Sequence, residues 1–263
     1  MTESVSDNSS QLVSPVIRGL RLLRYIAQGG NTGNLSEVGR LIDVNRVTVM
    51  RLLATLEHER MIERLPQGGH RIGLSFLTMA AAGLGACDLV ETGRRFLLRL
   101  CEGLGLSAYL VIMDGNDVVY VAREMPESGL ISHIRVGSRV AAHLTAPGRS
   151  MLASLAPGDL EQRFAKSMPA PIRDKGPADF TQLKALLEED RTRGCAWSFS
   201  GYETGINACA AAVRGASGEA VAALSVVGPE HLFTRDEAFA TNVEAAVRQA
   251  AGELSLIAAG GLL

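Results

Sequence analysis

The feature that most constrains this fold is a series of three short amphipathic helical patterns near the N-terminus. Pro15 suits the first turn of the first helix, and Gly29 and Gly30 end it. Ser36 and Asn45 are the expected N-caps of the second and third helices. Apolar residues at helical spacing form the expected buried stripes: Val16, Leu20, Leu23, Ala27, Val38, Leu41, Ile42, Val49, Leu52, Leu53 and Leu56. Helices this short depend on packing for stability, so the three should bury these stripes against one another.

A hairpin pattern follows the third helix. Residues 61–64 and 70–72 are strand-like, and residues 66–69, with the sequence Pro-Gln-Gly-Gly, form the turn between them. The order helix, helix, turn, helix, hairpin predicts a winged helix-turn-helix over residues 14–73, a fold that binds DNA. Residues 14–76 carry nine Arg, no Lys and five acidic residues, which gives a local charge of +4. Because the whole chain has a net charge of −2, the remaining residues together carry −6. A basic module on an acidic body agrees with a nucleic-acid-binding domain.

The remaining chain divides by composition and pattern. Residues 1–13 are rich in Ser, Asn and Asp, so we expect a disordered tail. Residues 74–89 are rich in Ala, Leu and Gly with one charge, which predicts a linker helix that also packs against another surface, such as a second subunit. Residues 90–263 mix helices and strands without regular βαβ alternation, which favours an α+β domain with an antiparallel sheet. The expected strands cover residues 107–113, 118–123, 131–136, 140–144, 195–199, 206–213 and 220–227.

Other classes of protein find little support in the sequence. The cysteines at 87, 101, 195 and 209 have no CxxC spacing, so no metal site is expected. No signal peptide is visible and the apolar run 77–86 is too short to span a bilayer, so we expect a cytoplasmic protein without a membrane partner. The histidines are scattered, at 58, 70, 133, 143 and 231, and no nucleophile elbow, P-loop or complete dinucleotide fingerprint occurs. We therefore expect neither an enzyme nor a bound cofactor.

Several motifs, taken together, resemble one family. They are Asn45–Leu56, His70–Gly73, Arg135–Arg139, His143–Arg149, Gly201–Ile206 and Ala222–Pro229. Their order and spacing resemble the IclR family of transcriptional regulators over residues 14–258. The resemblance implies a GAF- or PAS-like effector-binding domain. It also implies homodimers, or dimers of dimers, that bind a pseudo-palindromic double-stranded DNA operator and respond to a small carboxylic acid.

The candidate DNA contacts lie mainly on the third helix. Asn45 would direct the N-terminus of this helix toward the major groove. The residues that project opposite its buried stripe are Arg46, Val47, Thr48, Met50 and Arg51. Arg46 or Arg51 could bond a guanine edge, while Ser36 and Arg71 would contact phosphates. The alternative is that these side chains form an ordinary solvated face, which is the usual fate of charged residues outside a helix-turn-helix.

The resemblance also places the effector-binding residues. A carboxylate would be held at the start of a helix, here Ala146 and Pro147, with help from neighbouring strands. The strand and wall positions are Ser132, Val140, Ser198, Ala208, Ser225 and Val227. Pro147 has no N–H, and this set carries few polar groups, so we expect an aromatic or longer apolar acid. The alternative is that these residues belong to the core and that the pocket lies elsewhere.

A different class of function stays open at this point. The winged helix could serve protein contact or dimerisation in a ligand-binding module that does not bind DNA. Salt dependence separates the two functions, because DNA binding releases cations from the phosphates and weakens steeply as salt rises.

Overall fold

A computed structural model describes residues 12–85, 88–127, 132–164, 168–169, 176–235 and 237–260. The chain divides into two compact units, residues 1–86 and 87–263. Most of the expected N-terminal tail lies outside the described residues. Among the described helices, no single one is both long and apolar enough to cross a membrane.

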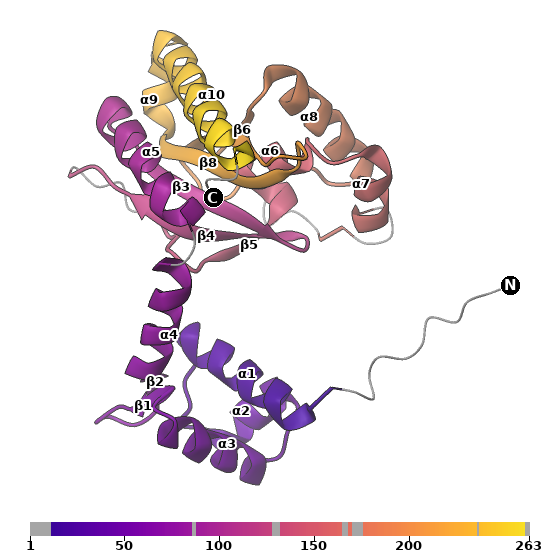
Figure 1. The fold of residues 1–263 in the computed structure, drawn as a ribbon. Helices are drawn as coiled ribbons and strands as arrows, with labels where there is room; N and C mark the ends of the chain where they lie inside the picture. Colours follow the sequence, from indigo (N-terminus) through magenta and orange to yellow (C-terminus); the bar gives the residue numbers. More distant parts are fainter. Residues whose placement is uncertain are drawn as a thin grey trace, which may run out of the picture. The chain divides into compact units, whose positions relative to one another are not determined.

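The first unit contains the predicted three helices and hairpin (Figure 1). Its elements are α1 (Ser14–Ala27), α2 (Leu35–Ile42), α3 (Arg46–His58), β1 (Ile62–Arg64), β2 (His70–Ile72) and α4 (Leu74–Gly85). The strands pair antiparallel, with Ile62 opposite Ile72. The shared core consists of Leu22, Leu23, Ile26, Val38, Ile42, Val49, Leu53 and Ile62. The prediction of a winged helix-turn-helix is confirmed.

The helix ends show which residues cap them. The side chain of Asn45 accepts the backbone N–H of Thr48 at 2.8 Å, as predicted for the third helix. The prediction for the second helix is wrong, because Asn34 caps it and Ser36 lies exposed in its first turn. Gly39 permits the tight turn between α2 and α3, since a Cβ there would lie 2.5 Å from the Val44 carbonyl oxygen. The sequence therefore fixes the position of α3 through local contacts at its start.

The predicted linker helix is divided in the structure. Helix α4 ends at Gly85 in the first unit, and α5 (Asp88–Leu104) begins the second unit. Val90 is buried in the core of the second unit. In contrast, Leu74, Leu77 and Met79 of α4 are 67%, 54% and 61% exposed. These apolar side chains are therefore uncovered within the described chain.

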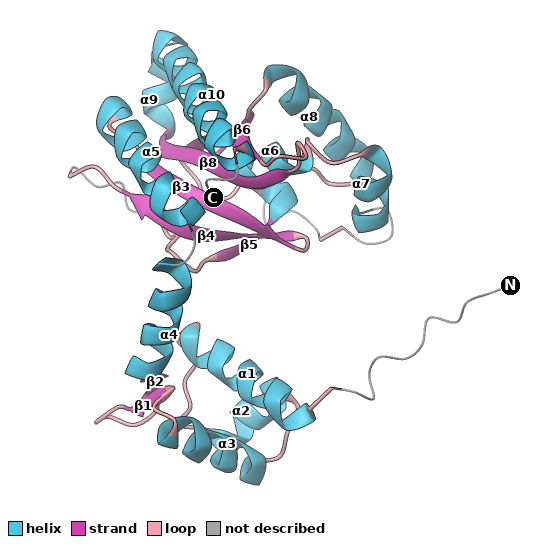
Figure 2. Cartoon of the chain, viewed as in Figure 1, coloured by secondary structure: helices cyan, strands magenta, loops and turns pink. Residues whose placement is uncertain are grey.

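The second unit is built on one antiparallel sheet of six strands in the order β5-β4-β3-β8-β7-β6 (Figure 2). The strands are β3 (Ser107–Asp114), β4 (Asp117–Glu124), β5 (Arg139–Ala141), β6 (Ala196–Phe199), β7 (Ile206–Arg214) and β8 (Ala220–Pro229). All their pairings are antiparallel, so the predicted α+β class with an antiparallel sheet is confirmed.

Helices cover both faces of this sheet. Helices α5, α9 (Glu230–Arg235) and α10 (Glu237–Ala259) contribute to the core on one face, and α6 (Ala146–Leu152), α7 (Pro157–Phe164) and α8 (Phe180–Arg193) to the core on the other. Side chains of β3 alternate between the two cores: Ala108 and Leu110 face α5 and α10, whereas Tyr109 and Val111 face the opposite layer. The sheet therefore separates two hydrophobic cores.

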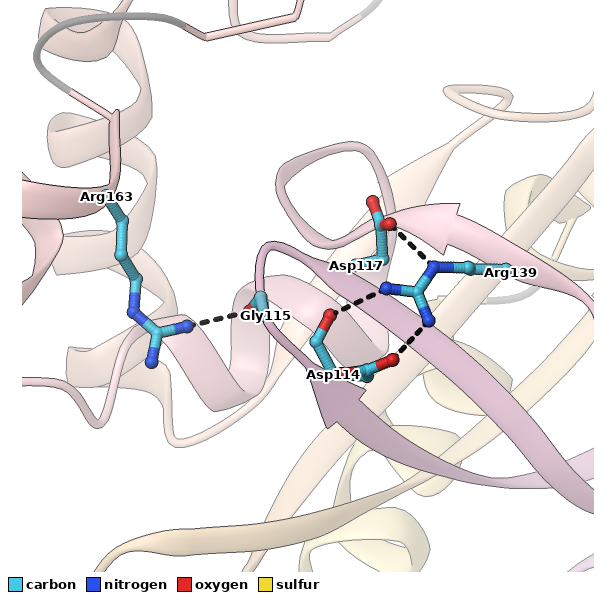
Figure 3. A network of polar contacts seen from close by, with 5 residues as sticks. All are labelled: Asp114, Gly115, Asp117, Arg139 and Arg163. Atoms are coloured by element: carbon cyan, nitrogen blue, oxygen red, sulfur yellow. Dashed lines mark hydrogen bonds and ion pairs between the residues drawn. The ribbon is translucent and has the colours of Figure 1, made fainter. Parts of the chain in front are cut away.

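Arginines hold the tip of the β3–β4 hairpin (Figure 3). Arg139 of the edge strand β5 donates from Nε to Asp117 at 2.8 Å and from another nitrogen to the carboxylate of Asp114. Arg163 of α7 donates to the carbonyl oxygen of Gly115 at 2.8 Å. Because β5 has three residues, these contacts supplement a short ladder of backbone hydrogen bonds.

The segment before β5 differs from its prediction. A strand was expected over residues 131–136, but residues 132–136 form none, and residue 131 lies outside the described part. Gly137, with φ of 88°, turns the chain and donates its N–H to the Tyr120 carbonyl oxygen at 2.7 Å. The strand expected at 140–144 is shorter, since residues 142–144 form the 3-10 helix η2 (Ala142–Leu144). Helix α7 was not predicted at all.

Candidate nucleic-acid interface and effector cavity

One face of α3, its free face, is exposed to solvent and carries the predicted DNA-binding side chains Arg46, Val47, Met50 and Arg51. Arg46 and Arg51 are exposed, and Val47 and Met50 are 65% and 51% exposed. Thr48 is half-buried at the margin of this face. The opposite stripe is anchored in the core by Val49 and Leu53. The helix therefore presents two guanidinium groups and two apolar side chains to solvent, which are groups that can contact base edges in a major groove.

The start of α3 adds a partial positive charge to this face. The first N–H groups of any helix lack partners within the helix. Asn45 satisfies the N–H of Thr48, which leaves those of Arg46 and Val47 at the open end. The helix dipole concentrates positive potential there, so an anionic phosphate is favoured at this position.

The wing and α2 hold the two remaining predicted contacts. Arg71 of β2 is exposed but already paired, since it donates to one carboxylate oxygen of Glu63 across the hairpin at 3.0 and 2.8 Å. This hydrogen bond is the main cause that lowers the pKa of Glu63. The carboxylate of Glu63 therefore neutralises part of the positive charge that Arg71 would offer to a phosphate. Ser36 is exposed in the first turn of α2.

The second unit contains a small cavity of about 30 Å³ against the start of α6. Its lining residues are Tyr120, Ile134, Thr145, Ala146, Pro147, Ser198, Tyr202, Glu203, Ile206, Ala208, Ser225 and Val227. The structure thus gathers six of the eight predicted effector residues around one space: Ala146, Pro147, Ser198, Ala208, Ser225 and Val227.

The other two predicted effector residues do not line this cavity. Val140 belongs to β5 and is 6% exposed, in the core that α6, α7 and α8 share with the sheet. The hydroxyl of Ser132 accepts the backbone N–H of Ile134 at 3.1 Å, and Ile134 takes the place in the lining. The turn at Gly137 is the reason, because it redirects the chain that was expected to continue as a strand.

Six of the twelve lining residues have polar side chains, and the hydroxyl of one of them, Ser225, is unused. The Oγ atom of Ser225 is buried and has no hydrogen-bond partner among the described residues. At the start of α6, Thr145 accepts the N–H of Gly148 at 3.1 Å, and Pro147 has no N–H. The N–H of Ala146 is the remaining donor of this turn. A buried hydroxyl without a partner is costly, and a polar ligand atom within hydrogen-bonding distance of Ser225 would relieve this cost.

Two tyrosines and a glutamate complete the lining. Burial raises the pKa of both Tyr120 and Tyr202, so their hydroxyls are neutral at physiological pH. Glu203 is the only charged side chain in the lining, and its Oε1 accepts the backbone N–H of His133 at 2.8 Å. The lining therefore combines apolar and aromatic surface with a single negative charge.

Sequence reasoning missed half of these lining positions. They are Tyr120, Ile134, Thr145, Tyr202, Glu203 and Ile206. The motif from Gly201 to Ile206 contains three of them and was a signal of the family, but nothing local assigned it to the cavity. A hydrogen bond from the Ser200 N–H to Asn207 Oδ1, at 3.0 Å, closes the loop that carries these residues.

Family models match nearly the whole described chain. Residues 15–66 match the IclR helix-turn-helix domain, and residues 81–256 match the bacterial transcriptional regulator IclR C-terminal model.

Individual proteins match over similar lengths. The transcriptional repressor AllR of Klebsiella pneumoniae is 28% identical over 220 residues, which cover 83% of this chain and 81% of the repressor. A crystal structure of a transcriptional regulator, RHA06195 from Rhodococcus sp. RHA1, is 27% identical, with a TM-score of 0.80 and coverage of 95% and 99%. An IclR homologue from Microbacterium hydrocarbonoxydans, solved with 4-hydroxybenzoate, is 21% identical, with a TM-score of 0.78 and coverage of 92% and 98%.

Proposed function

Since this chain belongs to the IclR family of bacterial transcriptional regulators, we propose that it binds operator DNA through α3 and the wing, and that a small carboxylic acid in the cavity sets its DNA affinity. Operator DNA is in the bacterial cytoplasm, and we place the function there. The proposal that this protein binds DNA rests on the free face of α3, where the exposed Arg46 and Arg51 accompany Val47 and Met50.

Each side chain on this surface contacts a particular part of the DNA. Arg46 and Arg51 donate to guanine edges, and Val47 and Met50 contact thymine methyl groups. The open N–H groups at the start of α3 and the hydroxyl of Thr48 bind a phosphate. Ser36 and Arg71 hold flanking phosphates, with Arg71 shared between DNA and Glu63.

Fluorescence anisotropy tests DNA binding directly. The purified protein is titrated onto labelled DNA from upstream of its own gene, and onto random DNA, over a series of salt concentrations. We expect tighter binding to the upstream DNA and a steep loss of affinity with salt, because counterions are released from the phosphates. Weak binding without preference or salt dependence would instead favour a winged helix that contacts protein.

The effector part of the proposal rests on the unpaired hydroxyl of Ser225. A ligand carboxylate accepts hydrogen bonds from Ser225 and from the Ala146 N–H. Ile134, Ile206 and Val227 supply apolar surface for the body of the acid. Glu203 in the same lining repels any anion, and a second ligand carboxylate would add to this cost, so we infer an aromatic or apolar monocarboxylic acid.

The cavity must open for such a ligand. Its volume of about 30 Å³ is far below the roughly 300–1,000 Å³ of pockets for drug-sized ligands. The loop that carries Tyr202 and Glu203 is held over the cavity by the hydrogen bond from the His133 N–H to Glu203. Release of this bond is the expected step that admits the acid.

A thermal-shift panel tests the choice of acid. It compares benzoate, 4-hydroxybenzoate and phenylacetate with glyoxylate and pyruvate, each at a fixed concentration. An acid that binds the folded protein raises its unfolding temperature. We expect the aromatic acids to do so, and stabilisation by the two small oxo-acids alone would refute the preference.

We also propose a homodimer, formed through the uncovered apolar surface of the first unit. This surface comprises the exposed apolar side chains Leu74, Leu77 and Met79 of α4 together with Val16 and Leu20 of α1, which line a groove with Met79. A contiguous apolar area of this kind is characteristic of an interface. In sedimentation equilibrium the wild type should be dimeric or tetrameric, and the double variant Leu77→Glu, Met79→Glu should be smaller. An unchanged mass in this variant would exclude α4 from the interface.

A further inference from the structure

His70 joins three segments of the DNA-binding unit. It is the first residue of β2, and its ring is 8% exposed. Its Nδ1 lies 2.7 Å from Oγ1 of Thr32, in the loop between α1 and α2. Its Nε2 lies 2.9 Å from Oε1 of Glu57, in the C-terminal part of α3. One side chain therefore links the wing both to that loop and to the helix that carries the proposed base contacts.

The chemistry of His70, Thr32 and Glu57 determines which atom donates in each hydrogen bond. A carboxylate can only accept, so Nε2 of His70 carries a hydrogen and donates it to Glu57. The Thr32 hydroxyl donates to Nδ1 of the neutral ring, or accepts from Nδ1 when the ring is protonated. Both contacts persist in either charge state of the histidine. Thr32 is 3% exposed, so removing the His70 ring would leave its buried hydroxyl without a hydrogen-bond partner.

Away from its base, the wing has few other contacts that could fix the direction of its tip. Its strands are three residues each, and a two-stranded hairpin of this size is marginal without further contacts. At the base of the wing, Ile62 is buried in the helical core and Ile72 packs against that core. At the tip, Gly68 and Gly69 adopt left-handed conformations and have no side chain to pack. A contact between the wing and α3 therefore determines how far the tip stands from the free face of α3.

We propose that His70 is a positioning residue for DNA binding, which holds the wing at a fixed distance from α3 so that both reach one segment of DNA together. The inference rests on the proposed contact of the wing with phosphates. When the links through Thr32 and Glu57 are lost, α3 still enters the groove, but the wing no longer keeps its phosphate contacts.

The test compares matched histidine substitutions in the full chain. His70→Phe keeps a ring of similar size and removes both hydrogen bonds. His58→Phe is the control, because His58 belongs to the same unit, is 84% exposed and contacts only the carboxylate of Glu59 next to it. Binding to the upstream DNA is measured by anisotropy over a salt series, and folding by thermal unfolding.

For His70→Phe we expect about a tenfold loss of affinity and a salt slope shallower by about 0.9, since Arg71 is the wing residue proposed on a phosphate and each lost contact removes roughly 0.9. His58→Phe should keep the wild-type slope and affinity. A purely structural role would lower the unfolding temperature and the fraction of active protein without changing the slope. A wild-type slope in His70→Phe therefore overturns the proposal, whatever its affinity.

A second pair of variants covers the case in which His70→Phe does not fold. Thr32→Val keeps the shape of the side chain and removes the hydroxyl, whereas Thr32→Ser keeps the hydroxyl. The valine variant should show the shallower slope and the serine variant the wild-type slope, and equal slopes would overturn the proposal. If the wild type itself shows no salt-dependent binding, the proposed function fails instead.

Discussion

Arg149 and Asp190 form an ion pair that is almost closed to solvent, with side chains 6% and 3% exposed and 2.9 Å between Nε and Oδ2. Arg149 belongs to α6 and Asp190 to α8, and the same guanidinium donates to the backbone carbonyl of Trp197 in β6. Burial raises the pKa of Asp190, and the neighbouring Arg149 opposes this rise. The pair thus anchors the helix whose first residues line the cavity.

Asp190→Asn should therefore destabilise the second unit strongly. Removing one partner leaves a buried charge uncompensated, which typically costs about 3–5 kcal/mol of unfolding free energy. Glu253→Gln is the matched control, because it weakens an exposed pair with Arg99 and should leave the unfolding free energy nearly unchanged. Urea denaturation measures the unfolding free energy of both variants. Equal losses would show that the buried pair of Arg149 and Asp190 stabilises the protein no more than the exposed pair does.

The cap of the recognition helix allows stability and DNA binding to be separated. Asn45→Ala removes the acceptor for the Thr48 N–H and should cost about 0.5–2 kcal/mol of unfolding free energy. Asn45→Asp keeps an acceptor and should retain stability, but its negative charge at the phosphate position should weaken DNA binding. Unfolding curves and anisotropy on the two variants test this, and an Asp variant with full DNA affinity would contradict a phosphate at this helix start.

Arg51 should discriminate between DNA sequences. If it donates to a guanine edge, Arg51→Ala should weaken binding to the preferred DNA by about 1–3 kcal/mol and binding to random DNA much less. Arg94→Ala provides a control with the same change of charge, because Arg94 lies exposed on α5 in the second unit. Equal losses on both DNAs would make Arg51 a phosphate contact.

Ser225 and Ser107 form a natural comparison for the cavity. Both hydroxyls are buried without a partner among the described residues, but only Ser225 lines the cavity. Alanine at either position should leave stability unchanged or raise it by about 1 kcal/mol, because an unpaired hydroxyl is removed. Only Ser225→Ala should abolish the thermal shift caused by an effector acid. A full shift in that variant would exclude Ser225 as a ligand contact.

His143 should make stability depend on pH. Burial lowers its pKa in the folded state, its Nε2 donates to the Pro169 carbonyl oxygen at 3.0 Å, and its Nδ1 is unpaired within the described structure. The unfolded chain takes up the proton first, so stability is full above about pH 6.5 and decreases as pH falls below it. Denaturation at pH 7.5 and 5.5 should show a smaller loss for His143→Phe than for wild type. The exposed His133, changed to Phe, should behave as wild type.

The parts of this fold that could be predicted from sequence depend on local periodicity. The helices α1 to α3 and the long strands β3, β4, β7 and β8 have regular apolar spacing, and Asn45 is a strong cap at a clear helix start. Ser36 was mistaken for a cap because Asn34, two residues earlier, is also a capping type, and the extended backbone at Asn34 decides between them.

The rest depends on contacts between distant residues. The run 132–136 has the composition of a strand, but a hydrogen bond from Gly137 to Tyr120 turns it back and places Ile134 in the cavity. Tyr202 and Glu203 reach the cavity because a loop is closed by Ser200 and Asn207. The pair of Arg71 with Glu63 follows from strand register, which the hairpin pattern alone left undefined.

Selection of binding sites from a randomised DNA library shows whether α3 reads DNA sequence, and it does not depend on where the operator lies. The account predicts enrichment of a pseudo-palindromic sequence with half-sites separated by whole helical turns, about 10–10.5 base pairs or a multiple, as two copies of one helix require. The Arg51→Ala variant should lose preference at one position of each half-site. A folded wild-type protein that enriches no sequence, with and without the effector acids, would contradict the claim that α3 reads DNA.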